Sequence, residues 1–393
     1  MTSKLASRSR MTSCAPGQRH GWRRSTLRIA GLVCAIGLVN AVPAQHGVAT
    51  EFRPAMPDYQ YEFPQDHGTH DEFQTEWWYY TGHLQATNGH TFGYQLTFFR
   101  RAAPSKPAAQ NPSRWAIRQL YFAHFALTDE TGRRFHFFEK MSRAGIGKAG
   151  AEVGRLAVWV DGWRAEADGD QHVLQATAGD LSLRLRLTPE KPPVIHGLAG
   201  ISRKGNHPGE SSHYYSFTRM KTGGTLMLDG TTVPVTGISW MDHEFGSHQL
   251  STEQVGWDWF SLQFADATEL MIYQIRRQDG SVEPASGGTW IRADGVAVPL
   301  ARDDITLEVL DHWQSPQSDG RYPGRWRIRI PSVGLTADVA PTVSAQELIT
   351  RHSTQVTYWE GSVTVAGQRE GRTVAGVGYA ELTGYATPLR RRL

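Results

Sequence analysis

The chain has 393 residues, with 41 lysines and arginines against 38 acids and a formal charge of +3. Seven of the positive charges lie in the first 44 residues, so the remaining 349 carry a formal charge near −4. That balance argues against nucleic-acid binding, which needs a surplus of basic side chains to displace counterions from phosphates.

The first 44 residues are typical of a secretory signal peptide. They contain no acid, and an apolar run from Ile29 to Val39 leads to Val42-Pro43-Ala44. The run is shorter than the ~20 residues that span a bilayer. We expect cleavage before Gln45 and a periplasmic or secreted protein, with the Arg23-Arg24 pair compatible with twin-arginine export. Both cysteines lie in this leader, so we expect no disulfide, thiol nucleophile or cysteine-bound metal in the mature chain.

Beyond the leader, apolar side chains alternate with polar ones along short segments, the period-two pattern of β-strands. It is clearest at residues 92–98, 181–187 and 326–330, and the pairs at 88–89, 279–280 and 294–295 predict tight turns. A helical pattern is nearly absent; residues 344–351 could form two turns. The expected fold is all-β, with antiparallel barrels and no segment after the leader apolar enough to cross a membrane.

A faint internal repeat divides the mature chain. Residues 77–101 and 257–277 both open with an aromatic strand and close a hairpin with two arginines. Residues 237–242 and 376–381 share a glycine, a branched residue, and an aromatic and an acid two positions apart. The sequence therefore predicts two related domains, residues 45–250 and 251–393, after the leader at 1–44.

The sequence does not support three common kinds of catalytic or cofactor motif. A G-x-G-x-x-G match at residues 145–150 precedes a strand pattern instead of the helix that a dinucleotide site requires. In His243-Glu244-Phe245-Gly246-Ser247-His248 the second histidine comes one residue too late for a zinc protease. No G-x-S-x-G elbow is present. We expect no cofactor and no tightly bound metal, although His67, His70, Asp71, Glu72 and Glu76 form a group that could ligate one.

The candidate functional residues are concentrated around position 250. Acids at 242, 244 and 258 lie among tryptophans at 240, 257 and 259. A carboxyl group against apolar rings is either paired or has a raised pKa, because a low dielectric disfavours its charge. Two interpretations remain open: these residues close a barrel end, or one of them is a general acid that faces an apolar ligand.

These residues belong to motifs that resemble the AttH/CrtC-type lipocalin-like family. The resemblance runs from about residue 55 to 388 and includes Asp66-His67-Gly68-Thr69-His70, Glu76 to Leu84, Ser212 to Ser216, Trp240 to Gly246, Gly256 to Phe260, Tyr358 to Gly361 and Gly378 to Tyr385. It implies two calycin-like β-barrels. The family includes carotenoid 1,2-hydratases, which add water to an isoprenoid double bond, and a secreted branch described as predicted hydrolases.

The resulting hypothesis is an exported hydratase without a redox cofactor. Asp242 or Asp258 would protonate an alkene, and His243 or Glu244 would take a proton from the attacking water. The partner would be an apolar small molecule, with ring faces stabilising the carbocation. The expected ligand contacts are Trp77, Trp78, Tyr215, Trp240, Trp257, Trp259 and Tyr273. The alternatives are a non-catalytic carrier of a lipid or isoprenoid, and a hydrolase.

Overall fold

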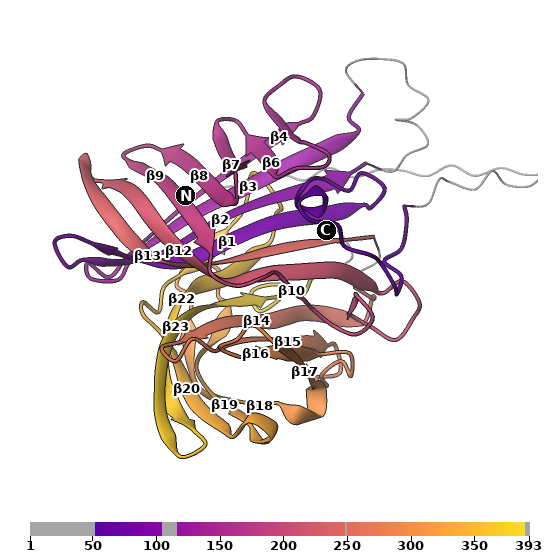
Figure 1. Ribbon diagram of the computed structural model, residues 1–393, viewed down its shortest axis with the longest axis vertical. Coiled ribbons are helices and arrows are strands. Elements are labelled where there is room, and N and C mark those ends of the chain that lie inside the picture. The colour runs from indigo at the N-terminus through magenta and orange to yellow at the C-terminus, as the bar shows by residue number, and fades with distance from the viewer. Residues whose placement is uncertain (1–51, 104–115, 248–249, 390–393) are drawn as a thin grey trace, which may run out of the picture. The chain divides into compact units, whose positions relative to one another are not determined.

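The computed structural model describes residues 52–103, 116–247 and 250–389, which belong to one compact unit. The predicted signal peptide lies outside the described residues. The described part is almost entirely β-strand, as expected, and its three helices are single 3-10 turns: η1 (Gln65–His67), η2 (Arg302–Asp304) and η3 (Pro331–Val333). The strands form two antiparallel sheets (Figure 1).

The first sheet contains thirteen strands and curls into a nearly closed barrel. Its path is β4-β3-β2-β1-β13-β12-β9-β8-β7-β6-β5, with β10 and β11 both paired to β12. The bounds are β1 (Thr75–Ala86), β2 (Thr91–Ala102), β3 (Gln119–Asp129), β4 (Arg134–Arg143), β5 (Ala149–Ala151), β6 (Ala157–Val160), β7 (Trp163–Asp168), β8 (Gln171–Ala178), β9 (Leu181–Pro189), β10 (Val194–Ile195), β11 (Ser202–Arg203), β12 (Ser211–Leu228) and β13 (Thr231–Gly246).

The second sheet contains ten strands and forms a half-barrel. Its path is β17-β16-β15-β14-β23-β22-β20-β19-β18, with β21 paired to β22. The bounds are β14 (Gln254–Phe264), β15 (Glu269–Arg277), β16 (Gly287–Ile291), β17 (Ala297–Ala301), β18 (Thr306–Gln314), β19 (Arg321–Ile330), β20 (Leu335–Pro341), β21 (Glu347–Ile349), β22 (Thr357–Arg369) and β23 (Arg372–Thr383). The sheets divide between Gly246 and Gln254, and independent folding of residues 45–250 and 251–393 stays a prediction.

Two local expectations can be compared with the strands. The helical turns expected at 344–351 are wrong: Glu347–Ile349 is a short strand, in which Leu348 is buried and pairs with Tyr358 of β22. Pairing with a neighbouring strand here overrides a weak local preference for helix. The glycine motif at 145–150 is followed by strand β6, as expected, and not by a helix.

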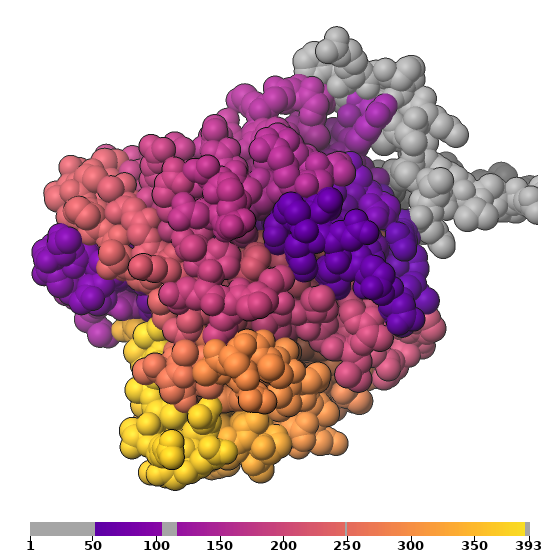
Figure 2. Space-filling view, viewed as in Figure 1, coloured from indigo at the N-terminus to yellow at the C-terminus, as the bar shows by residue number. Residues whose placement is uncertain are grey.

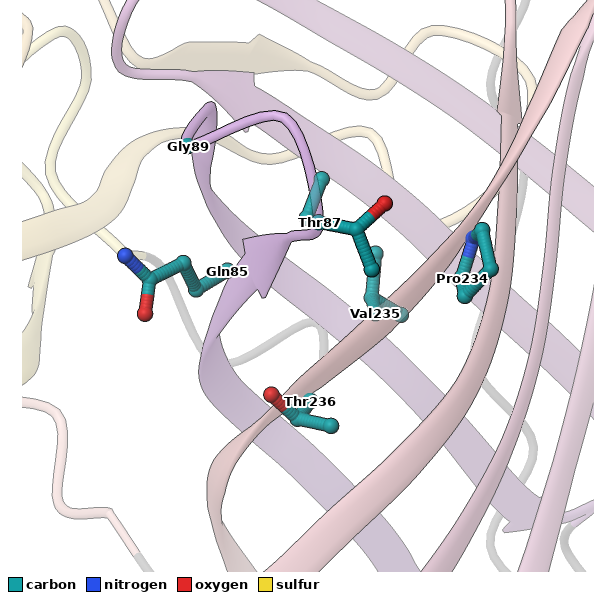
Figure 3. A pocket seen from close by; sticks show the side chains of 7 residues that line it. Gln85, Thr87, Gly89, Pro234, Val235 and Thr236 are labelled. Carbon is teal, nitrogen blue, oxygen red and sulfur yellow. The ribbon is translucent and has the colours of Figure 1, made fainter.

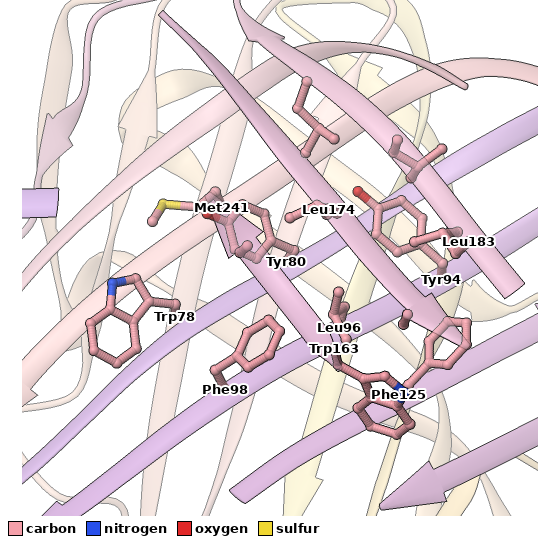
Figure 4. Close-up of a cluster of buried hydrophobic side chains, with 14 of the residues drawn as sticks. Trp78, Tyr80, Tyr94, Leu96, Phe98, Phe125, Trp163, Leu174, Leu183 and Met241 are labelled. Atoms are coloured by element: carbon pink, nitrogen blue, oxygen red, sulfur yellow. The ribbon is translucent and has the colours of Figure 1, made fainter. Parts of the chain in front are cut away.

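Each sheet encloses its own apolar core. In the first, Trp78, Tyr80, Phe98, Trp163 and Met241 are among the side chains that fill the interior (Figure 4). The alternating leucines of β9 all contribute to it, whereas Arg184 and Arg186 between them are exposed. The segment before β1 covers part of this sheet (Figure 2); for example, Ser211 Oγ of β12 donates a hydrogen bond to the Ala55 carbonyl. No helix in the described ranges is long and apolar enough to cross a bilayer.

A third apolar cluster contains side chains from both sheets. Its buried members are Tyr79, Val194, Tyr214, Trp240, Trp259, Met271, Ile291 and Tyr379, and Trp77, Trp257, Tyr273 and Ala297 are partly buried against them. Strands β1, β12 and β13 contribute from the first sheet, and β14, β15 and β23 from the second. This intersheet cluster brings together aromatic residues that lie far apart in the sequence.

Candidate functional site

Strand β13 carries the predicted site residues on two opposite faces. Trp240, Asp242 and Glu244 face the intersheet cluster, whereas Met241 and His243 face the interior of the first sheet. Successive side chains of a strand point in opposite directions. The neighbouring strands repeat the division, since Asp242 is level with Tyr79 and Ser216, and His243 with Trp78 and Tyr215. Of the two bases considered for Asp242, His243 and Glu244, only Glu244 shares its face of β13, whereas His243 belongs to a different network.

Asp242 is a buried acid without a basic partner among the described residues. Its Oδ1 accepts hydrogen bonds from Trp240 Nε1 at 2.6 Å and from the Ser216 hydroxyl. The Tyr214 hydroxyl is a further hydrogen-bond partner of the carboxyl group, and all three donors favour its charged form. Burial, with a smaller contribution from the charge of Glu244, raises the pKa of Asp242 to about 7 against the opposing effect of its hydrogen bonds. At neutral pH, Asp242 can therefore hold a proton and release it.

Glu381 of β23 joins Asp242 and Glu244 to form what we call the acid cluster. Glu381 is directly paired with Trp259 on the neighbouring strand β14, and its side chain is partly exposed. Burial, together with the charges of Glu244 and Asp242, raises the pKa of Glu381 to about 7, and a hydrogen bond with Trp257 opposes the shift. The repeated closing motif of the two halves contains both Asp242 and Glu381, but the sequence did not indicate that they meet.

Glu244 is the member of the acid cluster that has a positive partner. Lys204 Nζ lies 3.0 Å from Glu244 Oε1, and the Ser212 hydroxyl donates to the same oxygen. The lysine ammonium also lies over the rings of Tyr214 and Tyr273, 5.3 and 4.6 Å from their centroids. Lys204 was not singled out from the sequence.

The rings around the acid cluster include five of the seven predicted ligand contacts. Trp240 and Trp259 meet edge to face at 6.4 Å, and Trp259 Nε1 donates to the Tyr214 hydroxyl at 3.2 Å. Trp77, Trp257 and Tyr273 complete the set and, like Glu381 and Lys204, are partly exposed. The acid cluster is therefore bordered by side chains that keep some contact with solvent.

Asp258 lies apart from the acid cluster. Because Trp257 and Trp259 face the intersheet cluster, Asp258 between them points to the other face of β14. There Arg276 Nε lies 3.2 Å from its Oδ1, and the Tyr385 hydroxyl donates to Oδ2 at 3.0 Å. Burial raises the pKa of Asp258, and Arg276 partly opposes the shift. A hollow of about 300 Å³ is lined by Asp258 and by Phe260, Ile272, Arg302 and Leu307.

The other two predicted ligand contacts, Trp78 and Tyr215, lie inside the first sheet with His243. The Trp78 indole stacks on the His243 ring at 4.8 Å, and the Tyr215 hydroxyl lies 3.0 Å from His243 Nδ1. His243 Nε2 lies 2.9 Å from Glu76 Oε1. Glu76 is thus the carboxyl group that contacts His243.

His70, Glu76 and His243 offer three potential metal-ligand atoms within 4.8 Å of one another. Their surroundings do not suit a cation. Arg100 Nε lies 2.8 Å from Glu76 Oε2, and hydrogen bonds to Asp66 and Glu76 outweigh burial and raise the pKa of His70 to about 9, so His70 carries a proton. The positive charges of Arg100 and His70 thus already balance the carboxylates of Glu76 and Asp66. That the protein binds no transition metal stays a prediction.

A second hollow, of about 320 Å³, lies where the β1–β2 hairpin meets the start of β13 (Figure 3). Gln85, Ala86, Thr87, Gly89, Pro234, Val235 and Thr236 line it. None of these side chains is titratable, so this hollow offers no acid–base chemistry.

The two antiparallel sheets, each wrapped around its own core, define the class of lipocalin-like β-barrel proteins. Within this class, the family described as AttH-like matches residues 54–385, and the chain belongs to that family, as its motifs indicated. A crystal structure of a Nitrosomonas europaea protein described as AttH is 35% identical, with a TM-score of 0.76, and the match covers 85% of this chain and 99% of that one.

Two more distant proteins have names that state a reaction. Kievitone hydratase of Nectria haematococca shares the fold, with a TM-score of 0.64 at 14% identity over 86% of this chain and 97% of that chain. Dehydratase asqC of Emericella nidulans is 23% identical over 217 residues. That match covers 53% of this chain and 60% of the length of the dehydratase.

Proposed function

We propose that the protein is a hydro-lyase, which adds water to, or removes it from, an apolar substrate at the acid cluster. The observation that carries the proposal is Asp242, a buried acid among tryptophan rings, whose pKa is raised to about 7 by burial and which has no basic partner in the described part of the chain. A general acid works best when its pKa is close to the working pH. A hydratase and a dehydratase among the similar proteins support the same class of reaction.

In the hydration direction, Asp242 transfers its proton to one alkene carbon, and the other carbon becomes cationic. The faces of Trp240 and Trp259 stabilise that charge. Water attacks the cationic carbon while Glu244, held by Lys204 at 3.0 Å, takes one of the water protons. The product is an alcohol, and the proton returns from Glu244 to Asp242 through solvent. Dehydration follows the same steps in reverse: protonated Glu244 gives its proton to the departing hydroxyl, and the Asp242 carboxylate takes a proton from the carbon next to the cationic one.

The finer proposal concerns the substrate and the place of action. An isoprenoid with a trisubstituted double bond is our preferred substrate, because its protonation gives a tertiary cation that aromatic faces can stabilise. The basic leader followed by a short apolar run supports action outside the cytoplasm. Asp258 is not part of this mechanism, since its carboxyl group lies on the opposite face of β14.

The test is incorporation of labelled water. The protein is incubated in ¹⁸O-water with squalene, lycopene and their hydrated derivatives, and the products are analysed by mass spectrometry. We expect one substrate to gain labelled oxygen, and Asp242→Asn to abolish the gain while Asp258→Asn leaves most of it. If wild-type protein binds such a molecule tightly but incorporates no label, the protein is a carrier and the hydro-lyase proposal is wrong. Label appearing only in the cleavage products of an ester would instead indicate a hydrolase.

A further inference from the structure

The inner face of β13 carries a continuous chain of hydrogen bonds that the proposed hydro-lyase mechanism does not use. Glu76 Oε1 lies 2.9 Å from His243 Nε2, His243 Nδ1 lies 3.0 Å from the Tyr215 hydroxyl, and that hydroxyl lies 2.6 Å from His67 Nδ1. Glu76, Tyr215 and His243 are fully buried, and His67 is partly exposed. The chain therefore leads from a buried carboxylate to a ring near the surface.

The charges around Glu76 determine its protonation state. Arg100 Nε lies 2.8 Å from Glu76 Oε2, Thr69 Oγ1 donates to the same oxygen at 2.9 Å, and His70 Nδ1 lies 2.8 Å from Oε1. Although burial opposes it, Arg100, His243 and His70 hold the pKa of Glu76 well below its usual range. Glu76 is thus an ionised carboxylate that can only accept hydrogen bonds.

The positions of the remaining protons follow from this carboxylate. Burial lowers the pKa of His243, although its hydrogen bonds to Glu76 and to the Asp66 carbonyl oppose the shift, and we assign the ring as neutral with one N–H. Because Nε2 faces the Glu76 carboxylate, the proton must be on Nε2, and Nδ1 can only accept. With this assignment the Tyr215 hydroxyl donates to His243 Nδ1 at 3.0 Å, and the Asp66 carbonyl at 3.2 Å is the alternative acceptor of the same proton. Since the hydroxyl has a single proton, its oxygen accepts from His67, whose proton is then on Nδ1.

This arrangement leaves His67 Nε2 with an unshared lone pair. Among the described residues, the His67 ring forms its hydrogen bond through Nδ1 and not through Nε2. Aromatic rings surround His67, with the centroids of Phe63, Phe217 and His172 at 4.9, 5.6 and 5.8 Å. Burial, with a contribution from His243, lowers the pKa of His67 to about 4, so the ring is neutral at neutral pH. The main chain is also held, because Trp78 Nε1 donates to the His67 carbonyl at 3.1 Å.

We propose that Glu76, His243 and Tyr215 form a proton relay that ends at His67, and that His67 Nε2 is a second acid–base group of this protein, separate from the acid cluster. Its substrate would be an aromatic or apolar molecule that presents an O–H or N–H group to the ring. When Nε2 takes that proton, the Nδ1 proton moves to the Tyr215 oxygen and the proton of Tyr215 moves to His243 Nδ1. The positive charge then rests on His243 beside the Glu76 carboxylate, and the total number of protons in the relay has increased by one.

The tautomer of His67 can be measured directly. Long-range ¹H–¹⁵N NMR spectra of the mature protein, labelled in histidine, report which ring nitrogen carries the proton. Free histidine prefers the Nε2–H form, whereas the relay predicts that His67 is Nδ1–H and His243 is Nε2–H. In Tyr215→Phe, His67 should lose this preference. The matched control is Tyr80→Phe, which removes a hydroxyl 3.0 Å from the neighbouring His172 and should leave His67 unchanged.

A second measurement tests the reactivity that follows from the free lone pair. Diethyl pyrocarbonate acylates an unprotonated imidazole nitrogen, and peptide mass spectrometry locates the modified histidine. We expect His67 to react in the folded protein several times faster than His243 or His70, both of whose ring nitrogens have partners. An Nε2–H His67 in wild-type protein, or a His67 no more reactive than His243, would overturn the relay. Neither measurement depends on Asp242, so the hydro-lyase proposal can fail while the relay holds.

Discussion

Asp242 and His243 are adjacent in the sequence, but their side chains take part in two separate hydrogen-bond networks on opposite faces of β13. Asp242 Oδ1 accepts from Trp240 Nε1 at 2.6 Å between the sheets, whereas His243 Nε2 lies 2.9 Å from Glu76 Oε1 inside the first sheet. One face of β13 thus contributes Asp242 to the acid cluster, and the other contributes His243 to a hydrogen-bonded chain with Glu76 and Tyr215. Substitutions at these two positions should therefore have separable effects.

The first prediction concerns the proton donor. Asp242→Asn should reduce turnover of an identified substrate by about 10²–10⁴-fold, the usual contribution of a general acid, because an amide cannot deliver a proton to carbon. Substrate affinity should stay nearly unchanged, since amide and acid have almost the same shape. Turnover rates and ligand titration by tryptophan fluorescence measure the two effects. Asp258→Asn is the matched control, and equal losses in both variants would contradict the assignment of Asp242.

The second prediction concerns stability against pH. Burial raises the pKa of Asp242 from 3.8 to about 7 in the folded protein. Its contribution to stability is thus fully present below the unfolded pKa and is lost as pH rises through about 7. Asp242→Asn removes this dependence. The free energy of unfolding of the variant, relative to that of wild type, should therefore rise by up to about 1.4 kcal/mol for each pH unit between pH 4 and 7. Urea unfolding at pH 5 and 8 measures the difference, and a constant difference would show that Asp242 has an ordinary pKa.

The third prediction concerns the buried ion pair of the first sheet. Arg100 and Glu76 are level on β2 and β1, and their side chains are fully buried. Arg100→Met should lower the free energy of unfolding by about 3–5 kcal/mol, because it leaves a buried carboxylate without its main partner. Arg325→Met, which breaks an exposed pair with Asp338, should cost at most about 1 kcal/mol. Similar losses in the two variants, measured by urea unfolding, would be incompatible with this account.

The fourth prediction concerns processing. If residues 1–44 are a signal peptide, the exported protein should begin near Gln45, because small residues and Ala44 precede that position. N-terminal sequencing of protein recovered from the periplasm or the medium measures this directly. Replacing Arg23 and Arg24 with lysine should block export only if the twin-arginine route is used. An exported form that retains Met1 would contradict the prediction.

Much of the fold could be predicted from the sequence because strands leave a local signal. The leucines at 181–187 alternate with polar residues, and all four are buried in β9. The same logic fails at 344–351, where a three-residue strand depends on its pairing with β22 and has no pattern of its own. Family motifs indicated the lipocalin-like fold, because they cover strands of both sheets.

The sequence by itself determined which residue types surround Asp242: the tryptophan at 240 and the acid at 244 share its face through the period of a strand. Only the tertiary structure decided what that face meets. Glu381 and Lys204 reach it from distant parts of the chain, and no local pattern encodes their distance from Asp242. The same limit applies to His243, whose partners Glu76 and Tyr215 come from β1 and β12. The pKa of a buried acid depends on such neighbours and on how completely they exclude water, and both arise only when the two sheets are formed.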